Sequence, residues 1–273
     1  MDLGLQGKLA IVTGGTANIG RAIVLALANE GASVLFTGRD AEAGAKVADL
    51  ARENGAAAAR FLAVDMLAEG AAQQIMAAAQ AIGPVDVLIN NVGGNSSTGL
   101  FVDTDPGLWQ GDFDINMRTV LAMTHAVLPG MIERKGGAIV NLGSTAGIVG
   151  DYQLAVYSAM KGAVHAFTQV LAKEVGQHGV RVNCVAPYGT MSADPAAFSR
   201  GSRFNAESSF FASAFGGSSD FDKAMRGRQP LLQRTMPLGT PEEVAAMVVW
   251  LASSQASWVT GQICQVDGGA LLR

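Results

Sequence analysis

The N-terminal part of the chain reads as a buried strand, a glycine-rich turn and a helix, and this order restricts the fold more than any other feature. Leu9–Val12 is a short apolar run of strand type. Thr13–Gly20 follows as the turn, and Arg21–Asn29 has helical periodicity. Such a unit can direct backbone N–H groups and a helix N-terminus at a pyrophosphate. The turn alone could be only a tight turn, but its flanking strand and helix are the context that a dinucleotide site requires.

Strands alternate with helices along the rest of the chain, which favours a parallel sheet built of βαβ units. No linker rich in Pro, Ser or charge divides the sequence, so we expect one domain over residues 1–273. The composition, 49% hydrophobic and 15% charged, suits a sheet covered on both faces and further surface buried in an oligomer. The predicted strands are Leu9–Thr13, Ser33–Thr37, Ala59–Val64, Val85–Asn90, Ala138–Leu142, Arg181–Val185 and Ile263–Val266. The predicted helices are Gly20–Asn29, Ala41–Asn54, Ala71–Ala81, Pro106–Arg134, Ala155–His178 and Pro241–Ser253.

Charge and cysteine content restrict the partners and the location. The net charge of −4 gives no reason to expect nucleic acid or an anionic membrane as a partner. The first residues do not read as a signal peptide, and no apolar run reaches the length of a membrane span, so we expect a cytoplasmic protein. Cys184 and Cys264 lie in predicted strands and are expected to be free buried thiols. His125, His165 and His178 do not cluster, so we expect ordinary helix residues and no metal site.

Tyr157 and Lys161 form a candidate proton-transfer pair. They are four residues apart on a predicted helix, so both side chains leave the same face. An ammonium beside a phenol favours the phenolate and lowers the tyrosine pKa from its reference of about 10. Such a phenol can give a proton to a carbonyl oxygen or take one from an alcohol, and Ser144 could polarise that oxygen with a hydrogen bond. Chance matches to this spacing are common, so its weight comes from the dinucleotide unit that precedes it.

Further short motifs follow in one order along the chain. They are Thr13-Gly14 to Gly20, Asp65, Asn90-Asn91-Val92-Gly93, Asn116, Ser144, Tyr157, Lys161, Asn183 to Pro187, and Asp267-Gly268-Gly269. With these motifs the chain resembles the short-chain dehydrogenase/reductase family over nearly its whole length. The resemblance implies an α/β fold: a single doubly wound Rossmann domain, whose seven-stranded parallel sheet has the order 3-2-1-4-5-6-7, with helices on both faces. It also implies an NAD(P)-dependent oxidoreductase with the catalytic residues Asn116, Ser144, Tyr157 and Lys161.

The resemblance gives these four residues distinct roles in exchanging a hydride between a nicotinamide and a ketone or secondary alcohol. Tyr157 transfers the proton, and Lys161 lowers its pKa and hydrogen-bonds the nicotinamide ribose. Ser144 positions the substrate oxygen and stabilises its developing charge. Asn116 is implied to bend its helix locally and to hold a water in a proton relay, although an Asn in a helix is by itself more often solvated or capping.

The resemblance also implies the cofactor site. Its residues are Gly14, Thr16, Asn18, Ile19, Gly20, Arg39, Asp65, Asn91, Gly93, Tyr157, Lys161, Pro187, Thr190 and Ser192. Asn18 stands where the family usually has glycine, at a position that often needs a positive φ. Asn tolerates left-handed geometry better than other non-glycine residues, so we expect binding to survive.

Several other residues at the implied cofactor site have a second possible role. By resemblance Asp65 touches the adenine ring, whereas in isolation it reads as a loop or capping residue. Asn91 has a structural role as readily as a direct contact. Tyr188 stands where glycine is usual and Ser192 where threonine is common, so the contacts on the nicotinamide side are altered. Tyr188 could instead narrow the substrate pocket.

The end of the second strand indicates which nicotinamide cofactor is used. An enzyme that prefers NAD would place Asp or Glu there to accept from the ribose hydroxyls, but the position is Gly38. Arg39 follows, and its planar, permanently charged guanidinium suits a 2′-phosphate. We therefore expect NADP(H) to be favoured, with NAD(H) possible. The alternative is that Arg39 only solvates the adenine edge.

Residues 191–229 interrupt the alternation of strands and helices. This stretch holds six of the chain's 11 phenylalanines, and a structureless loop of this length is usually functional or mobile. In the related enzymes the region is the lid over the substrate. The alternative is two short helices that pack on the core or on a neighbouring subunit.

The substrate is the least defined part of the reading. Asn95, Tyr152, Leu154 and Tyr188 are the candidate contacts, and with the Phe-rich lid they favour a bulky apolar or cyclic ketone or alcohol. Arginines in the lid leave open an acyl thioester of coenzyme A or of a carrier protein, or else are solvated. A non-catalytic dinucleotide sensor usually loses the tyrosine or the lysine, which this chain keeps. The resemblance further implies a homotetramer assembled through the long helices Phe113–Arg134 and Ala155–His178.

Overall fold

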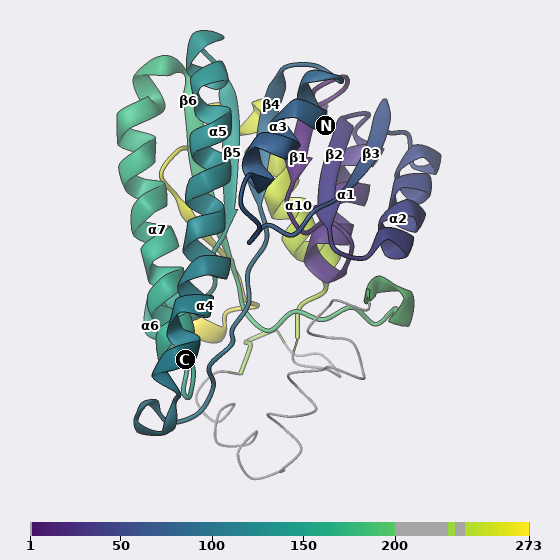
Figure 1. Cartoon of the computed structure of the whole chain (residues 1–273). Helices are drawn as coiled ribbons and strands as arrows, with labels where there is room; N and C mark the ends of the chain where they lie inside the picture. The colour runs from purple at the N-terminus through teal and green to yellow at the C-terminus, as the bar shows by residue number, and fades with distance from the viewer. Residues whose placement is uncertain (1, 200–228, 233–237, 273) are drawn as a thin grey trace.

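Seven parallel strands form one continuous sheet in the computed structural model, which describes residues 2–199, 229–232 and 238–272 (Figure 1). The order across the sheet is β3-β2-β1-β4-β5-β6-β7, and every adjacent pair is parallel. This confirms the predicted sheet and its strand order. The strands are β1 (Leu9–Val12), β2 (Ser33–Gly38), β3 (Ala58–Ala63), β4 (Val85–Asn90), β5 (Gly137–Leu142), β6 (Val180–Pro187) and β7 (Ile263–Val266).

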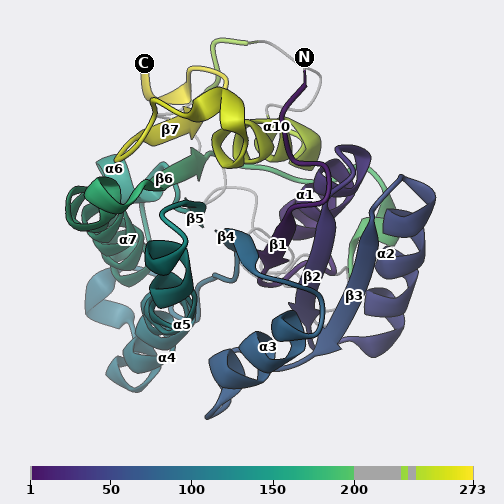
Figure 2. The same cartoon turned by 90° about the horizontal axis from the view of Figure 1, so that it is seen from above.

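Helices cover both faces of the sheet and create two separate cores (Figure 2). Successive residues of a strand point to opposite faces, so Phe36 packs in one core and its neighbour Leu35 in the other. This double burial explains why the strands are apolar runs and not alternating patterns. One face carries α1 (Asn18–Asn29), α2 (Ala41–Glu53) and α10 (Pro241–Ala252), and the other carries α3 (Ala71–Gln80), α5 (Thr119–Glu133) and α7 (Ala155–Val175).

The predicted helix Pro106–Arg134 is not continuous, which corrects the sequence reading. A 3₁₀ turn at Pro106–Leu108 leads into α4 (Trp109–Phe113), and a π-helical turn at Asp114–Arg118 separates α4 from α5. The π turn lies where the resemblance implies a local distortion around Asn116. Such turns are rare in proteins, and many of those that occur lie at functional sites.

The lid predicted at residues 191–229 lies largely outside the described residues. Residues 200–228 belong to that part, including five of its phenylalanines and all four of its arginines. The described beginning contains a 3₁₀ turn at Pro195–Ala197.

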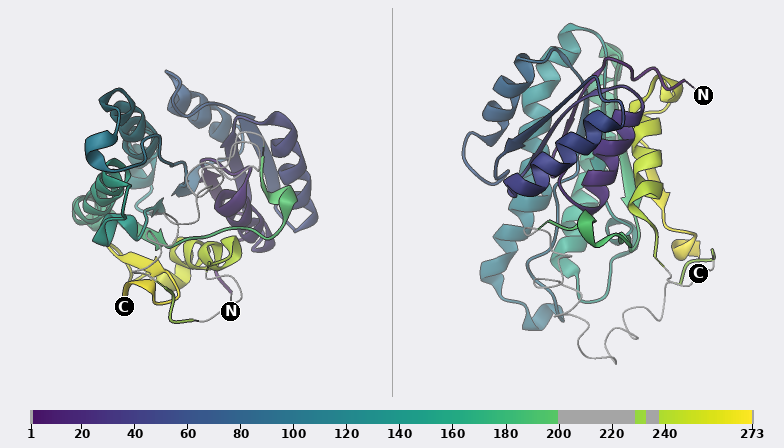
Figure 3. Two further views of the ribbon diagram at one scale, coloured as in Figure 1. Left: turned by 90° about the horizontal axis from the view of Figure 1, so that it is seen from below. Right: turned by 90° about the vertical axis from the view of Figure 1, so that its right-hand side faces the viewer.

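Other expectations can be compared with the described residues directly. Cys184 and Cys264 are free thiols, Cys184 buried and Cys264 partly buried. None of the helices in the described ranges combines the length and apolar character that crossing a bilayer requires. The N-terminal segment packs beside the turn after α10, where Ser254 N donates to Leu3 O at 3.0 Å (Figure 3).

The start of α1 has no room for a side chain at Gly20. A Cβ there would overlap the carbonyl oxygen of Gly14 and lie 2.6 Å from Nδ2 of Asn91. Replacing Gly20 with Ala should therefore lower the free energy of unfolding by about 1–3 kcal/mol, as overpacking does. Urea denaturation measures this change.

Gly162 is the matched control, because it lies inside α7 and its added Cβ would meet Gly147 O at an ordinary 3.4 Å. Replacing Gly162 with Ala should stabilise the protein by about 0.5–1 kcal/mol through helix propensity. A Gly20→Ala variant as stable as wild type would contradict the packing argument.

Candidate active site

A pocket of about 340 Å³ lies at the carboxyl ends of the strands, where the chain crosses from the β1-β2-β3 half of the sheet to the β4-β5-β6-β7 half. This reversal of strand order is where open α/β sheets bind their ligands. The glycine-rich turn, the ends of β2 and β4 and the start of α7 contribute its wall. Of the residues that the sequence indicates, the wall includes Gly14, Thr16, Asn18, Ile19, Gly20, Arg39, Asp65, Asn91, Gly93, Asn95, Tyr157, Lys161 and Pro187.

Asn91 ties the glycine-rich turn to the end of β4. Its Nδ2 donates to the carbonyl oxygens of Thr13 and Gly14, both at 2.9 Å, and its backbone N–H donates to Thr13 Oγ1 at 3.0 Å. These bonds hold two loops from neighbouring strands in a fixed relation along the pocket. Asn91 therefore has a structural role, and it also lines the pocket.

The end of β2 combines a small residue with a cationic one. A Cβ on Gly38 would lie 2.5 Å from Cγ2 of Thr16, so a side chain here would displace Thr16. Arg39 is exposed and lines the pocket. The next residue, Asp40, caps α2 by accepting from the N–H groups of Glu42 and Ala43 at 3.1 Å. The carboxylate nearest in sequence to Arg39 thus stabilises a helix N-terminus.

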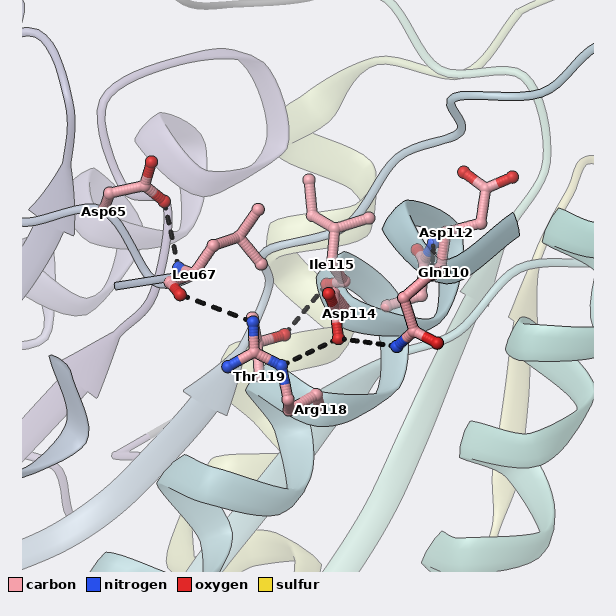
Figure 4. A network of polar contacts seen from close by, with 9 residues as sticks. Asp65, Leu67, Gln110, Asp112, Asp114, Ile115, Arg118 and Thr119 are labelled. Atoms are coloured by element: carbon pink, nitrogen blue, oxygen red, sulfur yellow. Dashed lines mark hydrogen bonds and ion pairs between the residues drawn. The ribbon is translucent and has the colours of Figure 1, made fainter. Parts of the chain in front are cut away.

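Figure 4 shows how the π turn is attached to the loop after β3. Asp65 Oδ1 accepts from Leu67 N at 2.9 Å, and Leu67 O accepts from Arg118 Nη2 at 3.3 Å. Arg118 Nε also donates to Asp114 Oδ1 at 2.8 Å, and this hydrogen bond lowers the pKa of Asp114. Asp65 therefore caps a turn and also lies in the pocket wall.

On its inner side the π turn holds the loop after β4 through Asn116, which is fully buried. Asn116 Nδ2 donates to Gly94 O at 2.5 Å and to Asp112 O at 2.9 Å, and its Oδ1 accepts from Gly94 N at 3.0 Å. The buried carboxylate of Asp112 accepts from Ser97 Oγ at 2.6 Å and from the backbone N–H of Ser96. Asn116 thus links the loop after β4 at Gly94 to the backbone of α4 at Asp112.

Lys161 places a buried ammonium beside Tyr157. Its Nζ lies 5.8 Å from the centre of the Tyr157 ring and donates to Leu142 O at 2.8 Å. Burial lowers the lysine pKa from its ordinary 10.5 to about 8. A Cβ on Gly93 would lie only 2.8 Å from Nζ, so a side chain there would displace the amine.

His165 lies within α7, as the sequence predicts, and packs beneath the loop that carries Ser144. Its Nε2 accepts from Ser144 N at 3.5 Å, and a Cβ on Gly147 would lie 2.7 Å from its Cε1. Burial and, to a smaller extent, the charge of Lys161 lower the pKa of His165 to about 4, so the ring is neutral at pH 7. Ser144 Oγ itself accepts from Ala146 N at 3.1 Å. His165 comes one helical turn after Lys161, so both side chains leave the same face of α7.

Other indicated residues lie apart from the pocket wall. Tyr188 lines a second hollow, of about 650 Å³, with Leu238 and Trp250. Tyr152 is 54% exposed, and Leu154 immediately precedes α7. Thr190 and Ser192 lie after β6, where the backbone of each is bonded to the Asn18 side chain.

A doubly wound parallel sheet, with a glycine-lined pocket at its reversal point and a Tyr–Lys pair in the pocket wall, defines a dinucleotide-dependent oxidoreductase. The family model of the short chain dehydrogenases matches residues 8–200, and the chain belongs to this family.

Relatives of known name agree with this assignment. The chain is 33% identical over 270 residues to the 3-oxoacyl-acyl-carrier-protein reductase of Chlamydia muridarum, covering 97% of this chain and 98% of the relative. It is 34% identical over 265 residues to 2-(S)-hydroxypropyl-CoM dehydrogenase 3 of Xanthobacter autotrophicus, covering 97% of each. A short-chain type dehydrogenase/reductase from Mycobacterium ulcerans has a similar structure, with a TM-score of 0.83 and 27% identity over 99% of this chain and 92% of that one.

The lowered pKa of Lys161 implies that its charge opposes folding. A shift from 10.5 to about 8 corresponds to about 3 kcal/mol, and a lost hydrogen bond to Leu142 offsets about 1 kcal/mol of this. Replacing Lys161 with Met should therefore raise the free energy of unfolding by about 2 kcal/mol at pH 7. Urea denaturation of both proteins measures the difference.

The pH dependence is the control. Between pH 8 and 10.5 the wild-type amine is deprotonated only in the folded state, so wild-type stability rises with pH across this window. The advantage of the Met variant should be constant below pH 8 and shrink above it. A difference that is independent of pH would refute the assignment to this amine.

Proposed function

We propose that the protein interconverts a ketone and a secondary alcohol with NADP(H), using Tyr157 as the general acid and base. The observation that carries this proposal is the placement of Tyr157 and Lys161 in the wall of the pocket that also contains the glycine-rich turn. The residues fit a dinucleotide, because Gly14, Gly20 and Gly93 leave the backbone bare where a Cβ would fill the site or strike a neighbour. The bound cofactor supplies or accepts the hydride.

The chain's own groups would perform the proton chemistry. The Lys161 ammonium favours the phenolate of Tyr157, so the phenol can transfer a proton to or from the substrate oxygen near neutral pH. Ser144 would donate to that oxygen and oppose its developing charge. Asn116 would act by linking the loop after β4 to α4, since its side-chain amide donates to Gly94 O and to Asp112 O. The water relay that the resemblance implies stays a prediction.

The cofactor contacts divide along the pocket. The glycine-rich turn and the N-terminus of α1 would face the pyrophosphate, while Asp65 would lie beside the adenine and Lys161 would reach the nicotinamide ribose. Arg39 would bind a 2′-phosphate, which supports NADP(H) over NAD(H).

The substrate class has two candidates. A bulky apolar or cyclic ketone or alcohol is the first, on the basis of Asn95, Tyr152, Leu154, Tyr188 and the predicted lid. A 3-oxo or 3-hydroxy acyl thioester is the second, and the name of the Chlamydia muridarum relative favours it. A non-catalytic dinucleotide sensor is disfavoured because Tyr157 and Lys161 are both kept. The homotetramer, supported by exposed apolar residues such as Leu121 on α5 and Val170 on α7, and the cytoplasmic location stay predictions.

Replacing Tyr157 with Phe tests the proton-transfer role. Turnover of a ketone panel with NADPH should fall by about 10²–10⁴, the usual contribution of a general acid. The affinity for NADPH, measured by fluorescence titration, should change by less than about twofold, because only a hydroxyl is removed. Retention of more than about a hundredth of the rate would count against the assignment.

Replacing Arg39 with Ala tests the cofactor preference. Loss of a charge-assisted contact worth about 1.5–3 kcal/mol should lower the ratio of kcat/KM for NADPH to that for NADH by about 10–100-fold. Lys46→Ala is the matched control, since it removes a cation from α2 that pairs with Glu42 away from the pocket wall. The preference is wrong if NADH is the better cofactor of the wild type, or if the ratio is the same in the Arg39 variant.

A further inference from the structure

The segment after β6 crosses the carboxyl edge of the sheet toward the ends of α1 and α2 (Figure 1). We call its residues 188–199 the strap. At its beginning, Gly239 N donates to Gly189 O at 2.9 Å and Met191 N donates to Gly239 O at 3.1 Å. At its end, Ser199 is buried and lines the same pocket as Arg39. The strap therefore runs from the end of β6 to a residue in the wall of the proposed cofactor site.

Side chains from the first turn of α1 tie the strap down. Asn18 Oδ1 accepts from Ser192 N at 3.2 Å, and Asn18 Nδ2 donates to Thr190 O at 3.5 Å. One helical turn further, Arg21 Nη1 pairs with Asp194 Oδ2 at 3.4 Å. Both ties start from the helix end that would face the pyrophosphate. The phosphate-binding turn and the strap are thus joined before any cofactor contact is made.

The backbone at Asn18 indicates that its side chain is used. Its φ is +43°, in the left-handed region that disfavours every residue except glycine, although Asn tolerates it best. Glycine would adopt this backbone without cost. The amide is buried, at 7% exposure for the residue, and both of its polar atoms bond the strap. The hydrogen bonds from Asn18 to the strap therefore offset its unfavourable left-handed backbone conformation.

We propose that Asn18 is a positioning residue that fixes the strap against the phosphate-binding turn and thereby slows release of the dinucleotide. This inference rests on the proposed function only in that the pocket binds the cofactor. A dinucleotide bound beside the glycine-rich turn would leave faster when the strap moves away, and breaking the bonds to Asn18 is one of the steps that this movement requires. Loss of two neutral hydrogen bonds corresponds to a change of about tenfold in the opening equilibrium.

The experiment compares wild type with Asn18→Gly in two measurements. Glycine suits the positive φ, so the variant keeps the turn and removes only the amide. Hydrogen exchange of the free protein, followed by mass spectrometry, should become about tenfold faster in residues 188–199 and stay unchanged in β1 and β4. Stopped-flow release of NADPH should become about tenfold faster.

Asp194→Asn is the matched variant, because it breaks the ion pair of Arg21 and keeps the shape of the side chain. Its effect on exchange and release should stay below about threefold, since the Asp194 side chain is half exposed and ion pairs that reach the solvent contribute little. An equal or larger effect than that of Asn18→Gly would overturn the role assigned to Asn18.

The outcomes separate this inference from the proposed function. Unchanged exchange in Asn18→Gly, or faster exchange without faster release, overturns the inference while the wild type still binds NADPH. Failure of the wild type to bind NADPH or NADH overturns the proposed function and the release step with it, and the exchange of the free protein still decides whether Asn18 holds the strap.

Discussion

The site depends on keeping the Lys161 ammonium out of water beside Tyr157. A buried charge is unfavourable, and here the neighbours that touch or face it are held neutral. Burial raises the pKa of the Cys184 thiol to about 12, and burial with the charge of Lys161 lowers the pKa of His165 to about 4. The Leu142 carbonyl accepts from the amine. The Tyr157 ring, whose centre is 5.8 Å from the amine, therefore faces a cation whose buried ionisable neighbours are neutral, and the proposed proton transfer would use this arrangement.

Glycines occur in this pocket where the backbone of one segment passes very close to atoms of another. Gly93 lets the loop after β4 pass the Lys161 amine, and Gly20 lets α1 start against the carbonyl of Gly14. In each case the missing Cβ makes room for a neighbour that carries chemistry or structure. The same loop is held from the other side by Asn116 on the π turn. The loop after β4 therefore lies between Lys161 on α7 and Asn116 on the π turn, at the wall of the pocket.

Local sequence patterns were sufficient to predict the sheet and the glycine-rich turn, because each strand is one continuous apolar run and the turn is one continuous motif. They were insufficient where distant residues decide the outcome. The π turn depends on bonds from Asn116 to Gly94, and Asn18 meets Thr190 and Ser192, far away in the chain. The contact of His165 with the loop that carries Ser144 likewise joins segments that are apart in the sequence. Tyr188 lines a hollow separate from the pocket that contains Tyr157, and its contact with the substrate stays a prediction.

The contact of Gly38 with Thr16 has a consequence for how cofactor use can evolve in this chain. A carboxylate at the end of β2 is the usual way to select the unphosphorylated ribose, yet any side chain at residue 38 strikes Thr16 in the phosphate-binding turn. An Asp or Glu at residue 38 would have to push the Thr16 side chain aside. The residue that would select the ribose and a residue of the glycine-rich turn are therefore sterically linked in this chain.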